Sequence, residues 1–171
     1  MSAFSRELPK QVQQYKDGRF TCWAAALESW MSVTPQSPAS WFIKTQDDAI
    51  AEWKSFSGSN SGLDVQWGFR LMAAAVGMEY GVFKPAKKIS GGFLYDKLKT
   101  RGHIYVLYAG GMTNTSGQFG HCVVVYGISN LWSDSCKVSF MDPWTANYKD
   151  EPLTYFQQAG EAVAGWFDYT A

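Results

Sequence analysis

Residues that build metal sites and disulfide frameworks are scarce in this sequence. Its 171 residues include only three cysteines and two histidines, and no pair of them has CxxC or HxxxH spacing. We therefore expect neither a metal ion nor another cofactor. Three cysteines cannot all pair within one chain, although a disulfide between Cys122 and Cys136 is an open alternative.

Long apolar runs and an excess of one charge are also missing. No stretch approaches the roughly 18 apolar residues of a membrane span, and the first twenty residues lack the apolar segment of a secretory signal. We therefore expect a chain that is cytoplasmic as synthesised, so that any export would use a leaderless secretion system. Fifteen basic residues balance fifteen acidic ones, which disfavours a nucleic-acid partner because such partners select clusters of positive charge.

The remaining composition is that of a folded domain. Hydrophobic residues make up 46% of the chain and charged residues 18%, which excludes extensive disorder. The length predicts one domain over residues 1–171. The many aromatic residues predict a packed core and, for some of them, an apolar cleft.

Hydrophobic periodicity predicts helices in the first part of the chain and strands in the second. After an extended polar arm over residues 1–20, the predicted helices are 21–31, 45–56, 64–76, 93–100 and 153–159, and the predicted strands are 80–83, 104–108, 122–126, 138–141 and 163–169. Thr21 is the expected N-cap of the first helix. Because βαβ alternation is missing, we expect an α+β fold in which an N-terminal helical layer packs on a C-terminal antiparallel β-sheet.

Cys22 stands at the N-terminus of the first predicted helix. Unpaired backbone N–H groups and the helix dipole favour negative charge there, and a thiolate is the reactive form of cysteine. The position therefore suits a nucleophile. A small, buried, unreactive cysteine is the simpler alternative at this stage, since free cysteine is among the most buried residues.

A nucleophilic cysteine needs a base, and two histidines compete for that role. His103 and His121 each follow a glycine where a strand begins, and His121 is preceded by a glycine-rich loop. Asp142 follows His121 by 21 positions and ends the next predicted strand. An aspartate there would reach back to His121 and fix its tautomer, although Asp142-Pro143 is also a common turn starter.

Together these segments resemble the papain-like cysteine peptidases. The similarity is carried by residues 21–26 (TCWAAA), 120–127 (GHCVVVYG) and 141–144 (MDPW), and it covers about residues 11–144. It points to the compact bacterial branch that includes bacteriocin-processing peptidases and AvrRpt2-like effectors of plant pathogens. The resemblance implies a papain-like fold with Cys22 as nucleophile, His121 as its base and Asp142 as the orienting residue, and it makes His103 peripheral.

The resemblance also implies a glutamine that binds the oxyanion together with the N–H of the nucleophilic cysteine. In the family this glutamine lies about six residues before the cysteine, but Lys16 occupies that position here. We expect Gln14 to take the role, with Gln13 and Gln11 as alternatives. A bulge at residues 17–18 would absorb the difference in spacing.

Three kinds of protein are compatible with these residues. The first is a cysteine protease that cleaves a protein or peptide, such as a bacterial effector or toxin with a neutralising immunity or inhibitor protein. The second is a deamidase, acyltransferase or amidase with the same triad, and the third is a catalytically inactive binding module. We expect specificity to reside in loops 57–62 and 110–119 and near Trp41, Trp53 and Trp67.

Overall fold

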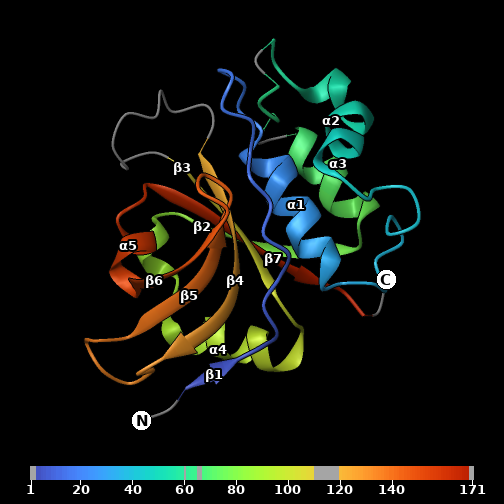
Figure 1. The fold of residues 1–171 in the computed structure, drawn as a ribbon. Helices are drawn as coiled ribbons and strands as arrows, with labels where there is room; N and C mark the ends of the chain where they lie inside the picture. Colours follow the sequence, from blue (N-terminus) through green and yellow to red (C-terminus); the bar gives the residue numbers. More distant parts are fainter. Residues whose placement is uncertain (1–2, 60, 65–66, 110–119, 170–171) are drawn as a thin grey trace.

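The computed structural model describes residues 3–59, 61–64, 67–109 and 120–169, which are built around one antiparallel sheet (Figure 1). The strands are β1 (Phe4–Ser5), β2 (Met78–Phe83), β3 (Ile104–Ala109), β4 (His121–Ser129), β5 (Lys137–Asp142), β6 (Asn147–Pro152) and β7 (Glu161–Phe167). They lie in the order β2-β7-β3-β4-β5-β6, and β1 pairs with β4 beyond the segment that pairs with β3. The predicted α+β class with an antiparallel sheet is confirmed.

Helices cover both faces of this sheet. They are α1 (Cys22–Ser32), α2 (Gln46–Glu52), α3 (Trp67–Ala75), α4 (Gly91–Thr100) and α5 (Leu153–Gln157), with short 3₁₀ helices η1 (Lys54–Phe56) and η2 (Ala86–Lys88). Helices α1, α2 and α3 pack on one face, and α4 and α5 contribute to the core on the other. The N-terminal arm, blue in Figure 1, runs from β1 along α1 and turns back into the start of that helix.

The core accordingly consists of two hydrophobic clusters, one on each face of the sheet. Strand β4 contributes to both, because successive side chains of a strand point to opposite faces. Cys122 and Val124 belong to the cluster under α1, whereas Val123 and Val125 belong to the cluster under α4 and α5. The side that each residue near the site faces is therefore set by this alternation.

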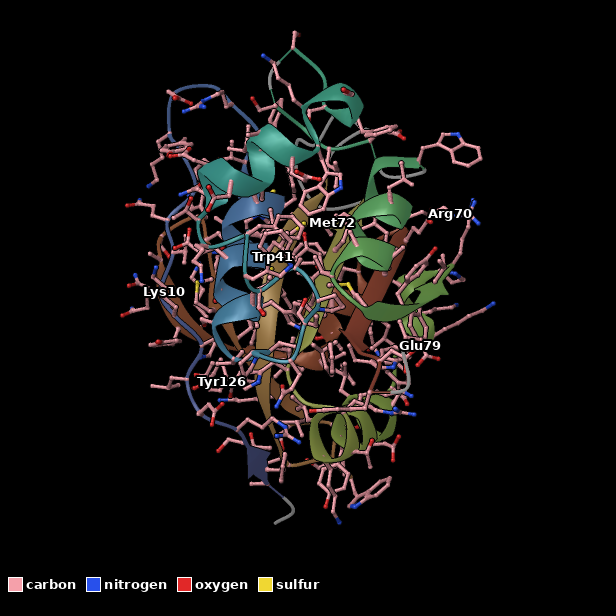
Figure 2. All side chains as sticks on the ribbon, turned by 90° about the vertical axis from the view of Figure 1, so that its right-hand side faces the viewer. Lys10, Trp41, Arg70, Met72, Glu79 and Tyr126 are labelled. Carbon is pink, nitrogen blue, oxygen red and sulfur yellow. The ribbon has the colours of Figure 1, made fainter. Side chains whose placement is uncertain are left out.

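Helix α1 is fixed against the sheet by buried contacts. Trp30 is fully buried, and its indole N–H donates to the carbonyl of His103 at 3.0 Å. In Figure 2, Met72 of α3 points inward beside α1, while Arg70 of the same helix points to solvent. This packing holds Cys22, the first residue of α1, at a defined place above the sheet.

Several predicted boundaries differ from the structure. The helix predicted over residues 45–56 ends at Glu52 and is followed by η1, and the helix predicted from residue 64 begins at Trp67. Thr21 is the N-cap residue of α1, as predicted, but its side chain makes no capping hydrogen bond, and its hydroxyl instead accepts from the N–H of Tyr15 at 2.9 Å. Strand β6 was not predicted, since its sequence NYKDEP is charged and lacks β-branched residues, as edge strands often do.

The three cysteines are free, and two of them lie close to one another. Cys22 and Cys122 belong to the cluster under α1, whereas Cys136 belongs to the cluster on the opposite face. The alternative of a disulfide between Cys122 and Cys136 is therefore wrong. Among the described residues, no helix combines the length and the hydropathy that crossing a membrane requires.

Candidate active site

Cys22 lies where the backbone of α1 offers unpaired donors. The first intrahelical bond is donated by Ala24 to the carbonyl of Thr21, so the N–H groups of Cys22 and Trp23 have no acceptor within the helix. Together with the helix dipole they favour negative charge at this end. The thiol itself is buried and donates to the carbonyl of Gly120 at 3.6 Å.

His121 is the first residue of β4, and its ring contacts the sulfur of Cys22. The ring packs edge-on against Tyr108, which lies opposite His121 on β3, with ring centroids 5.7 Å apart. Tyr108 is buried, and its hydroxyl is hydrogen-bonded to that of Tyr155 at 3.1 Å. This packing restricts the orientation of the imidazole, as a base that must meet a particular proton requires.

The second ring nitrogen of His121 is held by Asp142, the last residue of β5. Nε2 of His121 lies 2.6 Å from Oδ1 of Asp142, which leaves Nδ1 for the contact with Cys22. Strands β4 and β5 are neighbours, with Val124 opposite Met141, so the start of one lies beside the end of the other. The structure thus brings the three predicted residues together.

A lysine that the sequence analysis missed completes the surroundings of the carboxylate. Lys149 on β6 donates to Oδ2 of Asp142 at 2.6 Å, and the backbone N–H of Trp144 donates to Oδ1 at 3.0 Å. Asp142 is buried, so these bonds satisfy both of its oxygens. Recognition of residues 143–146 as a hairpin turn between β5 and β6 is the signal that would have revealed Lys149.

These contacts separate charge between the sulfur and the imidazole ring. A hydrogen bond from Cys122 and the contact with His121 lower the pKa of Cys22 well below its ordinary value, although burial opposes this. Burial lowers the pKa of His121, but the bonds with Asp142 and Cys22 raise it more, to about 9. Burial also opposes ionisation of Asp142, yet His121 and Lys149 hold its pKa below the ordinary value. These shifts favour a thiolate beside an imidazolium over the neutral pair.

Gln14, a residue of the N-terminal arm, lies beside this network. It is buried, and its backbone N–H donates to the carbonyl of Pro143 at 2.9 Å, just after the end of β5. Its side-chain oxygen is buried and has no hydrogen-bond partner among the described residues. The N–H of the next residue, Tyr15, donates to the hydroxyl of Thr21, so the arm is tied to the residue that precedes Cys22.

The two alternative glutamines are placed differently. Gln11 and Gln13 are both exposed. The side chain of Gln11 donates to the carbonyl of Ala146 at 2.8 Å, and the carbonyl of Gln13 accepts from Gln46 at 2.8 Å. The longer spacing between Gln14 and Cys22 is accommodated by a turn at which Gly18 has a φ of +89°, a conformation that glycine adopts without strain.

An apolar pocket lies beside the sulfur of Cys22. It is partly open to solvent. It is lined by Phe20, Cys22, Trp23, Gly62, Leu63, Phe69, Tyr105, Leu107, Gly120 and Cys122. Its apolar lining suits contact with an apolar group of a ligand, and its position would bring a neighbouring bond of that ligand to the sulfur.

The residues expected to govern specificity are only partly found there. Loop 57–62 reaches the pocket through Gly62, whereas loop 110–119 lies outside the described residues. Trp53 is buried against Trp23, with ring centroids 6.4 Å apart, while Trp41 and Trp67 are exposed. None of the three predicted tryptophans lines the pocket.

His103 has a structural environment. Its Nε2 lies 2.7 Å from the carbonyl oxygen of Glu7, and burial lowers its pKa. It precedes β3 at the end far from Tyr108, the strand partner of His121. Within the described ranges, no group of three or more His, Cys, Asp or Glu residues is arranged to hold a metal ion.

Comparison with known proteins gives an independent line of evidence. The family model described as papain-like cysteine protease AvrRpt2 matches residues 2–161. No curated protein matches the chain significantly. A solved structure of the Salmonella effector SpvD is similar, with a TM-score of 0.40 and 14% identity over 63% of this chain and 54% of that one. The match therefore spans about half of the length of that chain.

The match to a second solved structure covers more of both chains. This structure comes from work on the limited antibody cross reactivity between the mite allergens Blo t 1 and Der p 1. It has a TM-score of 0.40 and 12% identity, over 96% of this chain and 68% of that chain.

Proposed function

Because the chain belongs to the AvrRpt2 family of papain-like cysteine proteases, we propose that it hydrolyses peptide bonds in a protein or peptide substrate. In this proposal Cys22 is the nucleophile, His121 is the general base and acid, and Asp142 orients the histidine. The observation that carries it is the contact of Cys22 with a histidine whose Nε2 lies 2.6 Å from Asp142. A thiolate beside an imidazolium is the reactive state of a cysteine hydrolase.

Acylation begins when the thiolate of Cys22 attacks the carbonyl carbon of the scissile bond. The carbonyl oxygen takes the negative charge, and the backbone N–H of Cys22 and the side-chain amide of Gln14 bind it. Nδ1 of His121 then gives its proton to the departing amine as the carbon–nitrogen bond breaks. The product is a thioester between Cys22 and the acyl half of the substrate.

Deacylation uses His121 in the opposite sense. The neutral imidazole takes a proton from a water molecule, whose oxygen attacks the thioester carbon. Collapse of this intermediate releases a carboxylic acid and restores the Cys22 thiolate and the His121 imidazolium. Asp142 stays ionised throughout, because its contacts with His121 and Lys149 hold its pKa low despite burial.

The apolar pocket supports a proposal about the class of substrate. Its wall is apolar and lies beside the nucleophile, so we propose that the enzyme prefers an apolar side chain close to the scissile bond. Leu63 and Phe69 are placed to contact that side chain. Enlargement of the pocket by Phe69→Ala should shift preference toward larger side chains, and an unchanged preference would contradict this assignment.

The test of the peptidase combines labelling and cleavage. Wild type and Cys22→Ala are incubated with a thiol-directed inhibitor of papain-like enzymes, then with a proteome-derived peptide library, and both reactions are read by mass spectrometry. We expect a single adduct on Cys22 and a loss of cleavage of at least about 10⁴-fold in the variant. Cys136→Ala, which removes the thiol on the other face of the sheet, should retain both.

Other outcomes would redirect the assignment. Adducts on Cys22 without peptide cleavage would keep the nucleophile but indicate a deamidase, acyltransferase or amidase, which release of ammonia from glutamine peptides would identify. Equal labelling of Cys22 and Cys136 would indicate an inactive binding module. Cleavage that persists in Cys22→Ala would overturn the proposed nucleophile.

Family membership also supports a biological setting. We propose that the protein acts inside a target cell as a bacterial effector or toxin and that a neutralising immunity or inhibitor protein binds it. Expression of the wild type in such cells should be harmful, and expression of Cys22→Ala should be tolerated. Equal effects of the two proteins would separate any toxicity from the proposed chemistry.

A further inference from the structure

Strand β4 places a second thiol next to the proposed nucleophile. His121 and Cys122 are consecutive on this strand, so their side chains leave it on opposite sides. Cys122 belongs to the cluster under α1, which also contains Cys22. It is 1% exposed, and both cysteines line the same apolar pocket. The second thiol is therefore part of the site's wall.

The two thiols lie in the same pocket and the same hydrophobic cluster, and their surroundings decide which one keeps its proton. Cys22 contacts His121, and this cation favours ionisation of Cys22. Burial and the neighbouring charge of Cys22 raise the pKa of Cys122 well above its ordinary value. Two adjacent sulfurs in an apolar setting do not both ionise. The proton therefore stays on Cys122, whose S–H is the donor of the pair.

The immediate surroundings of the sulfur make this donor important. The carbonyl oxygen of Gly120 lies 3.6 Å from Sγ of Cys22 and accepts from the protonated thiol, so it disfavours the thiolate. The hydroxyl of Tyr105, in the same pocket, donates to the carbonyl of Trp23 at 3.1 Å and also contacts the thiol of Cys122. Among the contacts that lower the pKa of Cys22, the one with Cys122 is the largest.

We propose that the thiol of Cys122 donates a hydrogen bond to the Cys22 thiolate and thereby keeps the nucleophile ionised at neutral pH. The inference rests on the proposed function, in which Cys22 is the nucleophile. It makes Cys122 a positioning residue that acts through Cys22. A thiol is a weak donor, but a hydrogen bond to a charged acceptor is strengthened in an apolar pocket.

The experiment is the pH dependence of alkylation of Cys22 by iodoacetamide, followed for each cysteine separately by mass spectrometry. In the plot of alkylation rate against pH, Cys122→Ala should move the acid limb, where the rate falls as Cys22 becomes protonated, upward by about one pH unit. The reason is that one charged hydrogen bond is lost. Cys122→Ser keeps a hydroxyl donor and should leave the limb near its wild-type position. Cys136→Ala removes a thiol on the other face of the sheet and is the matched control.

Two results would overturn the inference. One is an unchanged acid limb in folded Cys122→Ala. The other is an equal shift in the Ala and Ser variants, which would attribute the effect to packing. Thermal unfolding checks that each variant is folded, and Cys122→Val, which fills similar space without a donor, replaces Cys122→Ala if that variant does not fold.

Failure of this inference and failure of the proposed function give different results. Alkylation of Cys22 requires no peptidase activity, so the limb would still shift if the protein were a deamidase or an inactive module. An active peptidase whose limb does not respond to Cys122→Ala would overturn the inference alone. In an active enzyme, kcat of Cys122→Ala should be lower than that of the wild type at pH values below the shifted limb, while KM stays near the wild-type value.

Discussion

The site has two sides that are built in different ways. On the sheet side, His121, Asp142 and Lys149 lie on three neighbouring strands and are joined by charged hydrogen bonds of 2.6 Å. On the helix side, Cys22 and Gln14 are positioned by backbone contacts, namely the start of α1 and the bond from the arm to the end of β5. The sheet side therefore governs charge, and the helix side governs position.

This difference leads to different expected responses. Charged hydrogen bonds are roughly twice as strong as neutral ones and respond to pH. Substitutions on the sheet side should therefore change the pH dependence of the reaction as well as its rate. Substitutions on the helix side should lower the rate while the pH profile keeps its shape, so each variant below tests the comparison itself.

The largest effect is expected from Asp142→Asn on the sheet side. The amide keeps the shape of the side chain but removes the charge that stabilises protonated His121. We expect kcat to fall by about 10⁴-fold, as loss of the orienting aspartate does in serine proteases, and the basic limb of the profile to move down from about pH 9. Steady-state kinetics across pH measures both changes, and a basic limb that stays near pH 9 would contradict the assignment.

Stability gives a second measure of the same variant. The folded-state pKa of His121 is about 9, above the ordinary value of 6.5, so its pairing stabilises the fold fully below about pH 6.5. This stabilisation is lost as the pH rises through about 9. The difference in free energy of unfolding between wild type and Asp142→Asn should shrink over that range, and denaturant unfolding at several pH values measures it.

The next largest effect is expected from Gln14→Ala on the helix side. Loss of one oxyanion donor lowers kcat by about 10²- to 10³-fold in comparable sites, and we expect little change in KM or in the pH limbs. Gln13→Ala is the matched control, because Gln13 is adjacent but exposed. If Gln13→Ala lowered kcat more than Gln14→Ala, the oxyanion assignment would pass to Gln13.

The helix side also shows which features could be predicted from the sequence and which could not. The start of α1 at Cys22 was predicted because the signal is local: an alanine-rich segment with apolar residues at helical spacing. The sequence favoured Gln14 over Gln13 and Gln11, but the burial that distinguishes Gln14 from the other two could not be predicted from it. This burial depends on bonds from the arm to Pro143 and Thr21, which are contacts that the folded chain creates.

On the sheet side, some features could not be predicted from the sequence for a different reason. The strands that carry His121 and Asp142 were predicted from their β-branched and aromatic residues, and the antiparallel order brings their ends together. Lys149 was missed because β6 has a polar sequence that is held in the sheet by pairing with β5. The contact between Cys22 and Cys122 depends on which face of β4 meets α1, and an isolated sequence does not specify this.

A smaller effect is expected from Lys149→Met on the sheet side. Removal of this cation leaves the carboxylate of Asp142 more available to His121, so the pKa of His121 should rise and the basic limb should move above pH 9. We expect kcat to fall about tenfold, which corresponds to about 1.4 kcal/mol of lost orientation. Lys149→Arg should restore the wild-type profile.

Lys10 provides the control for that variant. Its Nζ also lies 2.6 Å from a buried carboxylate, but that carboxylate belongs to Glu28 of α1, which accepts from Lys10 and from the N–H of Gln46 and not from His121 (Figure 2 labels Lys10). Lys10→Met should cost stability without moving the basic limb. If the basic limb lay at the same pH in Lys10→Met and Lys149→Met, Lys149 would have a structural role only.

The smallest effect is expected from Thr21→Val on the helix side. Valine fills the space of threonine but leaves the N–H of Tyr15 without its acceptor, which should destabilise the fold by about 1–3 kcal/mol. Because Tyr15 follows Gln14, the loss should also loosen the oxyanion donor, and about 1 kcal/mol of lost positioning lowers kcat about fivefold. Thr34→Val removes a buried hydroxyl at the other end of α1 and should cost similar stability while kcat is retained. If both variants lost the same activity, general loosening of α1 would explain it, and the helix side would govern stability more than position.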